Sequence, residues 1–183
     1  MADTQHHTNL AFVFPGQGSQ SVGMLADLAA AHESVRATFD EASQGAGRDL
    51  WSLAQNGPEE ELNRTENTQP ALLAASVAVW RVWGELGGAL PLQMAGHSLG
   101  EYSALVCAGA LSLHAAASLV AERGRLMQDA VPAGVGAMAA ILGGDDAQIA
   151  RVCDEVCGGE VVAPANYNSP GQLVIAGHAA AVD

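Results

Sequence analysis

The chain contains 183 residues, a length that suits one medium-sized domain, or one domain with part of another. Hydrophobic residues make up 49% of it and charged residues only 15%, so the composition supports a sizeable buried core and excludes a disordered chain. The formal net charge is −13, and all 7 basic residues are arginine. This acidic balance argues against general nucleic-acid binding, and it means that any anion-binding site must be a local feature.

The N-terminal segment, the length of the apolar runs and the cysteines bear on where the protein is located. Together they predict no membrane span and no disulfide framework. Residues 1–9 are polar and are predicted to form a disordered lead-in. No apolar run reaches the ~18 residues of a membrane-spanning helix, and no signal peptide is recognised. Cys107, Cys153 and Cys157 have no other metal-type ligands at matching spacing. We therefore expect a cytoplasmic protein with free thiols and no metal site.

A first buried strand is predicted at residues 10–14, which form a short continuous apolar run. Pro15 and Gly16 end this strand, and a glycine-rich loop continues to Gln20. The loop has two interpretations. It is either an ordinary turn, which the spacing alone favours, or a loop whose backbone N–H groups converge on an anion or oxyanion at the carboxyl end of the strand. The spacing of its glycines does not match a dinucleotide-binding fingerprint.

Several helices are predicted between this loop and the next strand. Apolar spacing indicates helices over residues 24–31 and 33–43, and Asp49 is a candidate cap of a further helical turn. The long helix that opens at residues 67–70 is apolar nearly all round, so we expect it to cover the sheet. Pro58 and the glutamates after it predict the start of another helix. Gly87-Gly88 predicts the end of the long helix.

Residues 96–100, which we call the elbow, have the form G-x-S-x-G. An apolar segment that includes Leu90 and Met94 precedes them, and a helix-prone segment over residues 101–108 follows. A bare G-x-S-x-G occurs by chance in many glycine-rich sequences, but this context is that of a nucleophile elbow, in which Ser98 adopts a strained conformation. The Ser98 hydroxyl would then stand at a helix N-terminus, where free N–H groups favour developing negative charge.

A helix is predicted over residues 114–129, and it carries an unusual arginine. Arg123 has apolar residues one turn before and one turn after it, so it lies on an apolar face. Arg125 has Glu122 and Asp129 at helical spacing and is predicted to be solvated and ion-paired. A buried, unpaired charge costs roughly 3–5 kcal/mol, so Arg123 needs a partner anion or must reach the surface. That partner is either a protein carboxylate or a substrate carboxylate, which arginine can bind in a bidentate manner.

The pattern changes after a glycine-rich boundary, which divides the chain into residues 10–132 and residues 133–183. The order of the expected elements is β-α-β-β followed by a helix start, which is most of a ferredoxin-like unit. We expect strands at residues 137–142, 161–163 and 172–177, a helix at 145–157, a turn at 166–171 and a helix start at 178.

Four segments, taken together, are specific to one protein family, although no single segment is specific by itself. They occur in this order and at these separations in the family, and the match runs from residue 10 to the last residue of the chain. The segments are residues 14–20, 68–72, 96–104 and 168–172. On these motifs the chain closely resembles bacterial malonyl-CoA:acyl carrier protein transacylases of type II fatty acid synthesis.

The resemblance implies a fold and a set of site residues. The fold would be an α/β-hydrolase-like core, a parallel sheet flanked by helices, with an incomplete ferredoxin-like subdomain. Ser98 would take malonyl from coenzyme A and pass it to the phosphopantetheine thiol of acyl carrier protein. The backbone N–H groups of Gln17 and Leu99 would form the oxyanion hole, Arg123 would pair with the malonyl carboxylate, and His97 would lie beside the site and contact substrate. The expected partners are malonyl-CoA and acyl carrier protein, and no cofactor beyond the coenzyme A thioester is implied.

The resemblance also implies a general-base histidine well downstream of residues 168–172, and no histidine of this chain matches it. Because a serine without a base is a weak nucleophile, the chain is predicted to be a C-terminally truncated transacylase that lacks its general base. Two other functions stay open. One is an unrelated G-x-S-x-G esterase, against which Arg123 counts. The other is a catalytically impaired remnant that only binds or folds, whose exposed strand edges would favour association.

Overall fold

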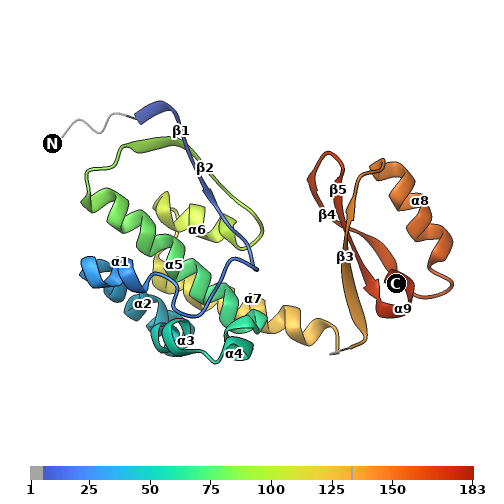
Figure 1. The fold of residues 1–183 in the computed structure, drawn as a ribbon, viewed down its shortest axis with the longest axis horizontal. Helices are drawn as coiled ribbons and strands as arrows, with labels where there is room; N and C mark the ends of the chain where they lie inside the picture. Colours follow the sequence, from blue (N-terminus) through green and yellow to red (C-terminus); the bar gives the residue numbers. More distant parts are fainter. Residues whose placement is uncertain (1–5, 133) are drawn as a thin grey trace. The chain divides into compact units, whose positions relative to one another are not determined.

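The computed structural model describes residues 6–132 and 134–183 of the chain. The fold is of the α/β type, and it divides into two compact units, residues 1–128 and residues 129–183 (Figure 1). The first unit contains a parallel pair of strands, and the second contains an antiparallel three-stranded sheet. None of the helices in the described ranges is both long and apolar enough to span a membrane.

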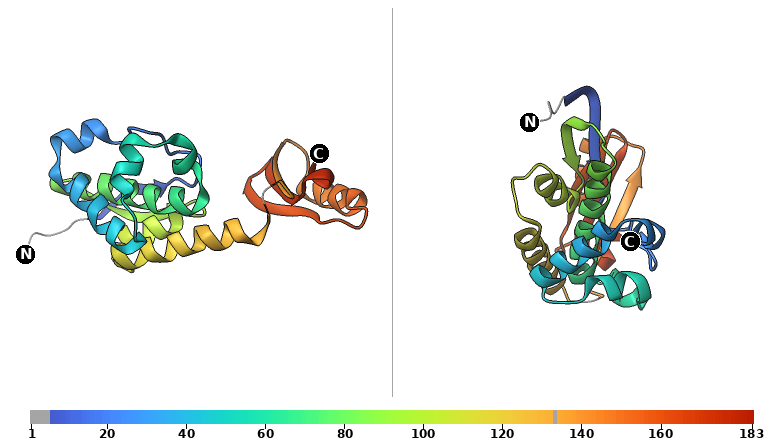
Figure 2. Two further views of the ribbon diagram at one scale, coloured as in Figure 1. Left: turned by 90° about the horizontal axis from the view of Figure 1, so that it is seen from below. Right: turned by 90° about the vertical axis from the view of Figure 1, so that its left-hand side faces the viewer.

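The first unit is mainly helical, and its helices gather around one long central helix (Figures 1 and 2). The predicted helices are confirmed, with ends that differ by a few residues. In chain order the elements are β1 (His6–Phe14), α1 (Ala26–Ala31), α2 (Glu33–Ala46), α3 (Leu50–Asn56), α4 (Glu59–Asn63), α5 (Thr65–Glu85), β2 (Leu90–Gly96), α6 (Gly100–Cys107) and α7 (Leu113–Ala130), the last of which ends just inside the second unit.

The parallel pairing of β1 and β2 brings two segments of the chain to the same edge of the sheet. Phe14 pairs with Gly96 at the carboxyl ends of the two strands. The glycine-rich loop after β1 and the elbow after β2 therefore start side by side. In open α/β sheets this is the edge at which ligands bind.

β1 begins earlier than the sequence predicts. The strand starts at His6 rather than at Leu10, so residues 6–9 belong to β1 and not to a disordered lead-in, while residues 1–5 lie outside the described part. The reason is that the polar start of β1 pairs with the first residues of β2. Backbone pairing therefore outweighs the polar side chains that indicated a disordered segment.

The central helix α5 supplies much of the core of the first unit, as its apolar sequence predicts. Leu73 is fully buried, and the surrounding cluster includes residues of α2, α3, α6 and α7. Toward the sheet, the Phe12 ring packs edge-on against Trp80 and Trp83, with ring centroids 5.1 and 5.5 Å apart. α5 is therefore the layer on which the strand before the glycine-rich loop rests.

Two helix starts show how local hydrogen bonds set the boundaries. α5 begins at Thr65, ahead of the predicted start at residues 67–70, because the Thr68 N–H already donates to the Arg64 carbonyl at 2.8 Å. The predicted cap of α3 is confirmed, since the Asp49 carboxylate accepts a 2.8 Å hydrogen bond from the first turn of that helix.

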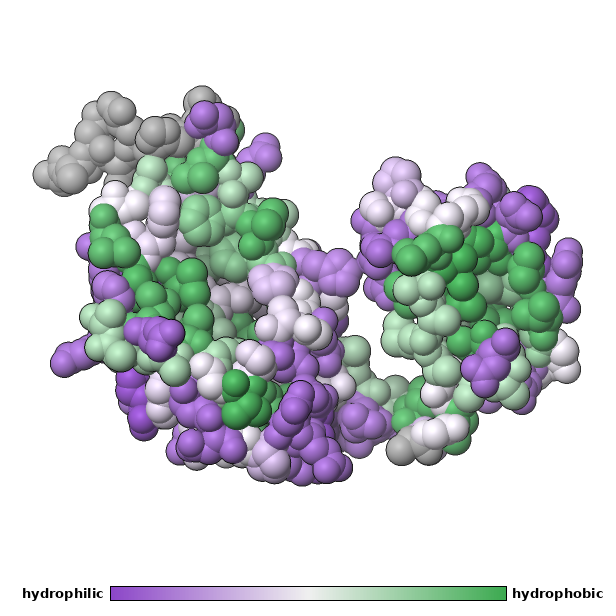
Figure 3. Space-filling view, in the orientation of Figure 1, coloured by the Kyte–Doolittle hydropathy of each residue, from purple (hydrophilic) through white to green (hydrophobic). Residues whose placement is uncertain are grey.

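The second unit has the predicted order of strands and helices. Its elements are β3 (Gly136–Leu142), α8 (Asp146–Val156), β4 (Val162–Ser169), β5 (Gln172–His178) and α9 (Ala179–Val182). β5 lies between β3 and β4 and is antiparallel to both. Apolar residues gather on the visible face of this unit (Figure 3). Its small buried cluster consists of Cys153, Val162, Leu173 and Ile175.

β4 is longer than the sequence predicts. A strand was expected at residues 161–163 and a turn at residues 166–171, but β4 continues to Ser169, and the turn is reduced to Pro170 and Gly171. β4 is an edge strand, so its backbone pairs with β5 while several of its polar side chains are exposed. Polar composition therefore indicated a turn where backbone pairing forms a strand.

Candidate active site

The chain after β2 has the geometry of a nucleophile elbow. Ser98 has a φ of 51°, a left-handed conformation that costs a non-glycine residue about 1–3 kcal/mol. A Cβ on Gly96 would overlap the backbone of Gly100, and a Cβ on Gly100 would overlap the carbonyl group of Phe14. Close backbone contacts therefore require both glycines of the motif. The predicted succession of strand, sharp turn and helix is confirmed.

The two segments that carry the expected oxyanion donors lie next to each other. The His97 N–H donates to the Phe14 carbonyl at 3.1 Å, and a Cβ on Gly16 would lie 2.9 Å from His97 Nδ1. Gly16 thus lets the glycine-rich loop approach the elbow. In the described ranges the backbone N–H groups of Gln17 and Leu99 donate no hydrogen bond, so both are available to a bound group.

Arg123 directs its guanidinium to the serine of the elbow. Nη2 donates to Ser98 Oγ at 3.0 Å, and Nη1 donates to Gln69 Oε1 at 2.6 Å. The guanidinium carbon lies 5.7 Å from the centre of the Tyr102 ring. Arg123 forms no ion pair with any carboxylate of the described residues. Of the two alternatives for its partner, the protein carboxylate is therefore not observed, and neutral groups hold this positive charge beside Ser98.

The neighbours of Arg123 on α7 account for its position. Gly124 is buried, and a Cβ there would lie 2.6 Å from Glu66 Cα, so α7 touches the first turn of α5 at this point. Arg125 forms the predicted exposed ion pair with Glu122, with Nη2 2.6 Å from Oε1. The hydrogen bond from Arg125 lowers the pKa of the Glu122 carboxyl. The two arginines thus have different environments although they are two residues apart.

Ser98 Oγ has a hydrogen-bond donor but no base among the described residues. Its partner is Arg123, and a guanidinium does not accept a proton. His97 is adjacent in sequence and exposed. His32 lies 3.5 Å from a glutamate at the end of α5, and His178 accepts a hydrogen bond from a backbone N–H of its own unit. No described histidine forms a hydrogen bond with the serine hydroxyl.

Gln69 is a residue of the site to which the sequence assigns no role. Its side chain is fully buried, and it contacts Arg123, Gln17 and Met127. The only sequence signal is its place at the end of the polar first turn of α5, directly before the apolar part of that helix. A buried amide needs hydrogen-bond partners, but the sequence does not say which ones.

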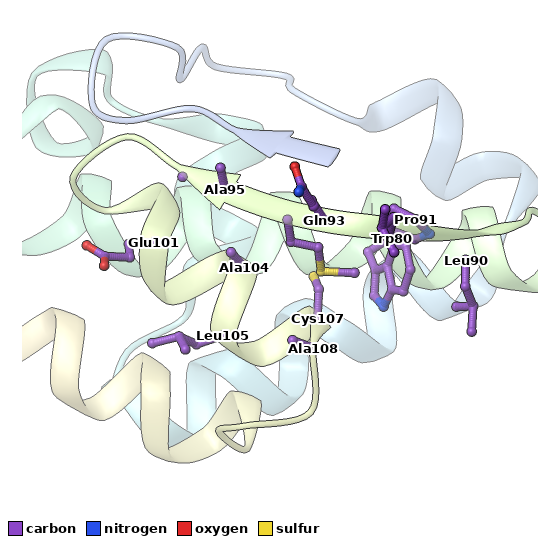
Figure 4. A pocket seen from close by; sticks show the side chains of 13 residues that line it. Trp80, Leu90, Pro91, Gln93, Ala95, Glu101, Ala104, Leu105, Cys107 and Ala108 are labelled. Carbon is purple, nitrogen blue, oxygen red and sulfur yellow. The ribbon is translucent and has the colours of Figure 1, made fainter. Parts of the chain in front are cut away.

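A cavity of about 790 Å³ lies along β2 and α6 (Figure 4). Gly96 and Glu101 are among its lining residues, whereas Ser98 and Arg123 are not. Cys107 also lines it, and burial raises the pKa of this thiol to about 12. A thiol that stays protonated is a poor nucleophile, so Cys107 is not a candidate nucleophile for acyl transfer.

Comparison with known proteins decides the family of the chain. The family model for the acyl transferase domain matches residues 11–183. The chain belongs to the acyl transferase domain family. The match includes the glycine-rich loop, the elbow and the helix that carries Arg123.

Curated relatives of this acyl transferase domain come from several bacteria. The malonyl CoA-acyl carrier protein transacylase of Escherichia coli (strain K12) is 64% identical over 176 residues, which cover 96% of this chain and 57% of the relative. The protein of the same name from Bacillus subtilis (strain 168) is 50% identical over 177 residues, 96% of this chain and 56% of the relative. The chain thus spans a little over half the length of the curated relatives that it matches.

Solved structures resemble the acyl transferase domain along nearly its whole length. The malonyl-CoA:acyl carrier protein transacylase of Xanthomonas oryzae pv. oryzae has a TM-score of 0.94 and 65% identity, and the match covers 98% of this chain and 57% of that one. A malonyl-transacylase in complex with its type II PKS acyl-carrier protein has a TM-score of 0.89 and 64% identity, covering 94% and 56%. These similarities confirm the α/β fold. The roles of Ser98, Gln17, Leu99, Arg123 and His97 stay predictions.

Proposed function

We propose that this acyl transferase domain moves a malonyl group from coenzyme A to the phosphopantetheine thiol of acyl carrier protein, in fatty acid biosynthesis. The observation that carries the proposal is the 3.0 Å hydrogen bond between Arg123 Nη2 and Ser98 Oγ. A malonyl thioester has a reactive carbonyl and a carboxylate close together, so its site needs a nucleophile and a cation at a short distance. The names of the curated relatives support the same reaction.

The reaction has two steps and one ester intermediate. Ser98 Oγ attacks the thioester carbonyl of malonyl-CoA, the C–S bond breaks, and the serine proton passes through a base to the departing coenzyme A thiolate. The thiol of acyl carrier protein then attacks the serine ester, the C–O bond breaks, and a proton returns to Ser98. The ester intermediate divides one difficult transfer into two easier steps.

Two backbone N–H groups are proposed to stabilise the oxyanion of both steps. Those of Gln17 and Leu99 belong to adjacent segments, and neither is used by another described residue. Preorganised donors of this kind are worth roughly 3–4 kcal/mol of transition-state stabilisation each. His97, beside Gly16, is proposed to contact the bound substrate.

Arg123 is proposed to bind the malonyl carboxylate and so to select the acyl group. Two of its N–H donors contact Gln69 and Ser98, which leaves further donors of the same guanidinium for the carboxylate. An esterase for neutral acyl chains would have no use for a cation held beside its nucleophile by uncharged groups. The arrangement therefore favours a carboxylated acyl group over acetyl.

A second candidate function follows from the partner of the serine. Ser98 Oγ contacts a donor and no base among the described residues, so we propose that complete turnover needs a proton acceptor from outside them. Without one, the chain would act as a binding fragment with impaired catalysis.

The finer description of the fold belongs to the same proposal. The parallel strands with their elbow support an α/β-hydrolase-like core in the first unit. The order β3-α8-β4-β5 in the second unit supports part of a ferredoxin-like subdomain. The expected cytoplasmic location is likewise part of what we propose.

Intact-mass spectrometry after incubation with malonyl-CoA tests the proposed function. We expect a malonyl adduct on the wild-type chain and none on the Ser98→Ala variant, with a weaker adduct from acetyl-CoA. If no adduct forms but malonyl-CoA still binds, the binding fragment is the better description. An adduct that persists in Ser98→Ala would contradict the assignment of the nucleophile.

A further inference from the structure

The amide of Gln69 joins three parts of the candidate active site. Its side chain is 0% exposed. Oε1 accepts a 2.6 Å hydrogen bond from Arg123 Nη1, while Nε2 lies 3.3 Å from Met127 Sδ and 3.4 Å from Gln17 Oε1. One residue of α5 therefore contacts the loop after β1 and two residues on adjacent turns of α7.

The chemistry of these partners fixes the direction of the amide. A guanidinium only donates hydrogen bonds, so Oε1 must face Arg123, and Nε2 is left to face the two acceptors. Burying an amide without partners costs about 1–3 kcal/mol, so the side chain of Gln69 is held in this orientation. The bonds from Nη1 to Gln69 and from Nη2 to Ser98 engage both terminal nitrogens of the guanidinium and together restrict its rotation.

The neutrality of Gln69 matters as much as its contacts. A carboxylate at the same place would also orient Arg123, but it would neutralise the guanidinium before any substrate arrived. An amide oxygen accepts the hydrogen bond and leaves the positive charge uncompensated. A fixed direction together with an available charge is what selective binding of a second carboxylate requires.

We propose that Gln69 is a positioning residue: it holds the Arg123 guanidinium toward Ser98 and keeps its charge free for the carboxylate of the acyl group. This inference rests on the proposed function, in which Arg123 binds that carboxylate. Gln69 acts through Arg123 and contributes selectivity between carboxylated and neutral acyl groups.

The first test compares the affinity of the 183-residue chain for two ligands. The ligands are the analogues of malonyl-CoA and acetyl-CoA in which carbon replaces the thioester sulfur, so that no acyl group can be transferred. Gln69→Met keeps an unbranched side chain of similar size but loses both amide bonds, and we expect it to lower the malonyl-to-acetyl affinity ratio about tenfold. Gln69→Glu should lower the ratio further, because its carboxylate competes with that of the ligand.

Thr68→Val is the matched control for damage to α5. Thr68 is also fully buried, and its hydroxyl donates to the Leu62 carbonyl at 2.6 Å, away from Arg123. Val has the same shape as Thr, so this variant removes a neighbouring buried hydrogen bond and should keep the wild-type affinity ratio. Melting curves of all variants report any general loss of folding.

The second test needs no substrate. In a chain labelled with ¹⁵N-arginine, the guanidinium signals assigned through Arg123→Lys report rotation about the Nε–Cζ bond by NMR. We expect slow rotation in the wild type and in Thr68→Val, and faster rotation in Gln69→Met. A purely structural role for Gln69 would leave the rotation unchanged.

The outcomes separate this inference from the proposed function. If Arg123→Ala abolishes the malonyl preference while both Gln69 variants retain it, Gln69 is not a positioning residue and the proposed function stands. If the wild type shows no malonyl preference, the proposed function fails, and the rotation of the Arg123 guanidinium still decides whether Gln69 holds it. Unchanged rotation in Gln69→Met would overturn the inference in either case.

Discussion

The two units bury different kinds of side chain. Among the described residues, the buried polar side chains all belong to the first unit, and three of them, Asn67, Thr68 and Gln69, follow one another in the first turns of α5. The buried cluster of the second unit is formed by a cysteine and aliphatic side chains, among them Leu173 and Ile175.

The two kinds of buried side chain stabilise a fold in different ways. Apolar burial has no preferred direction, so it holds the sheet of the second unit together without aiming any functional group. Hydrogen bonds of buried polar groups are directional, and in the first unit they aim Arg123 at Ser98. Changes in the first unit should therefore alter chemistry as well as stability, whereas changes in the second should alter stability alone.

The largest effect is expected from Gly100→Ala in the elbow. The new Cβ would overlap the Phe14 carbonyl group and lie 2.9 Å from the Pro15 carbonyl oxygen, and backbone atoms have little room to move. We expect a loss of more than about 3 kcal/mol in the free energy of unfolding, together with loss of the malonyl adduct on Ser98. Urea denaturation and intact-mass spectrometry measure the two effects.

Gly84→Ala is the matched control for this substitution. Gly84 lies in α5, and a Cβ there would meet nothing within 4 Å. Alanine favours a helix over glycine by about 1 kcal/mol, so this variant should be as stable as the wild type or more so. Equal stability of the Gly100 and Gly84 variants would contradict the close packing of the elbow.

Leu173→Ala tests the second unit. Leu173 is fully buried in β5, and its truncation should cost about 2–5 kcal/mol. Hydrogen exchange should show faster opening of β3, β4 and β5, while the malonyl-to-acetyl affinity ratio stays at the wild-type value. A changed ratio would show that the apolar core of this unit also aims the site. Met138→Ala, at a position that is 64% exposed, is the control and should change stability by less than about 0.5 kcal/mol.

Arg123→Ala and Arg125→Ala compare two arginines on one helix. Arg123 contacts Ser98 and Gln69, so its loss should lower the malonyl-to-acetyl affinity ratio about a hundredfold. Arg125 forms an exposed ion pair with Glu122, and its loss should change the ratio less than about twofold. Similar ratios for the two variants would remove the physical support for malonyl selection.

The elbow and the two arginines could be predicted because their signals are local. The motif over residues 96–100 specifies its own turn, and the spacing of residues around Arg123 and Arg125 separates an apolar face from an exposed one. In each case, residues within about four positions in the sequence were enough to predict the local structure. The structure confirms the turn and the different partners of the two arginines, although Leu126 and Met127 beside Arg123 are 54% and 48% exposed.

The contacts of Gln69 could not be predicted from local patterns. Its partners are 52 to 58 positions away in the sequence. Arg123 and Met127 meet it because α7 packs closely on α5 at Gly124, and Gln17 meets it from the loop after β1. The start of β1 and the end of β4 differ from the sequence prediction for a related reason. Their polar residues suggested a lead-in and a turn, but the pairing that makes them strands comes from β2 and β5, which lie elsewhere in the chain.

The smallest effect concerns Cys107, which borders the cavity along β2 and α6. Burial raises the pKa of its thiol from 9.0 to about 12, so at pH 8 it should react with iodoacetamide at least about tenfold more slowly than in the urea-unfolded chain. Because the folded state holds this proton more tightly, its contribution to stability is complete below pH 9 and is lost as the pH rises toward 12. Peptide mapping assigns the labelled thiol, and Cys107→Ser should flatten the alkaline loss of stability. Labelling of folded Cys107 at pH 8 as fast as in the unfolded chain would show that burial does not hold this proton, and the cavity along β2 and α6 would then contain a reactive thiol.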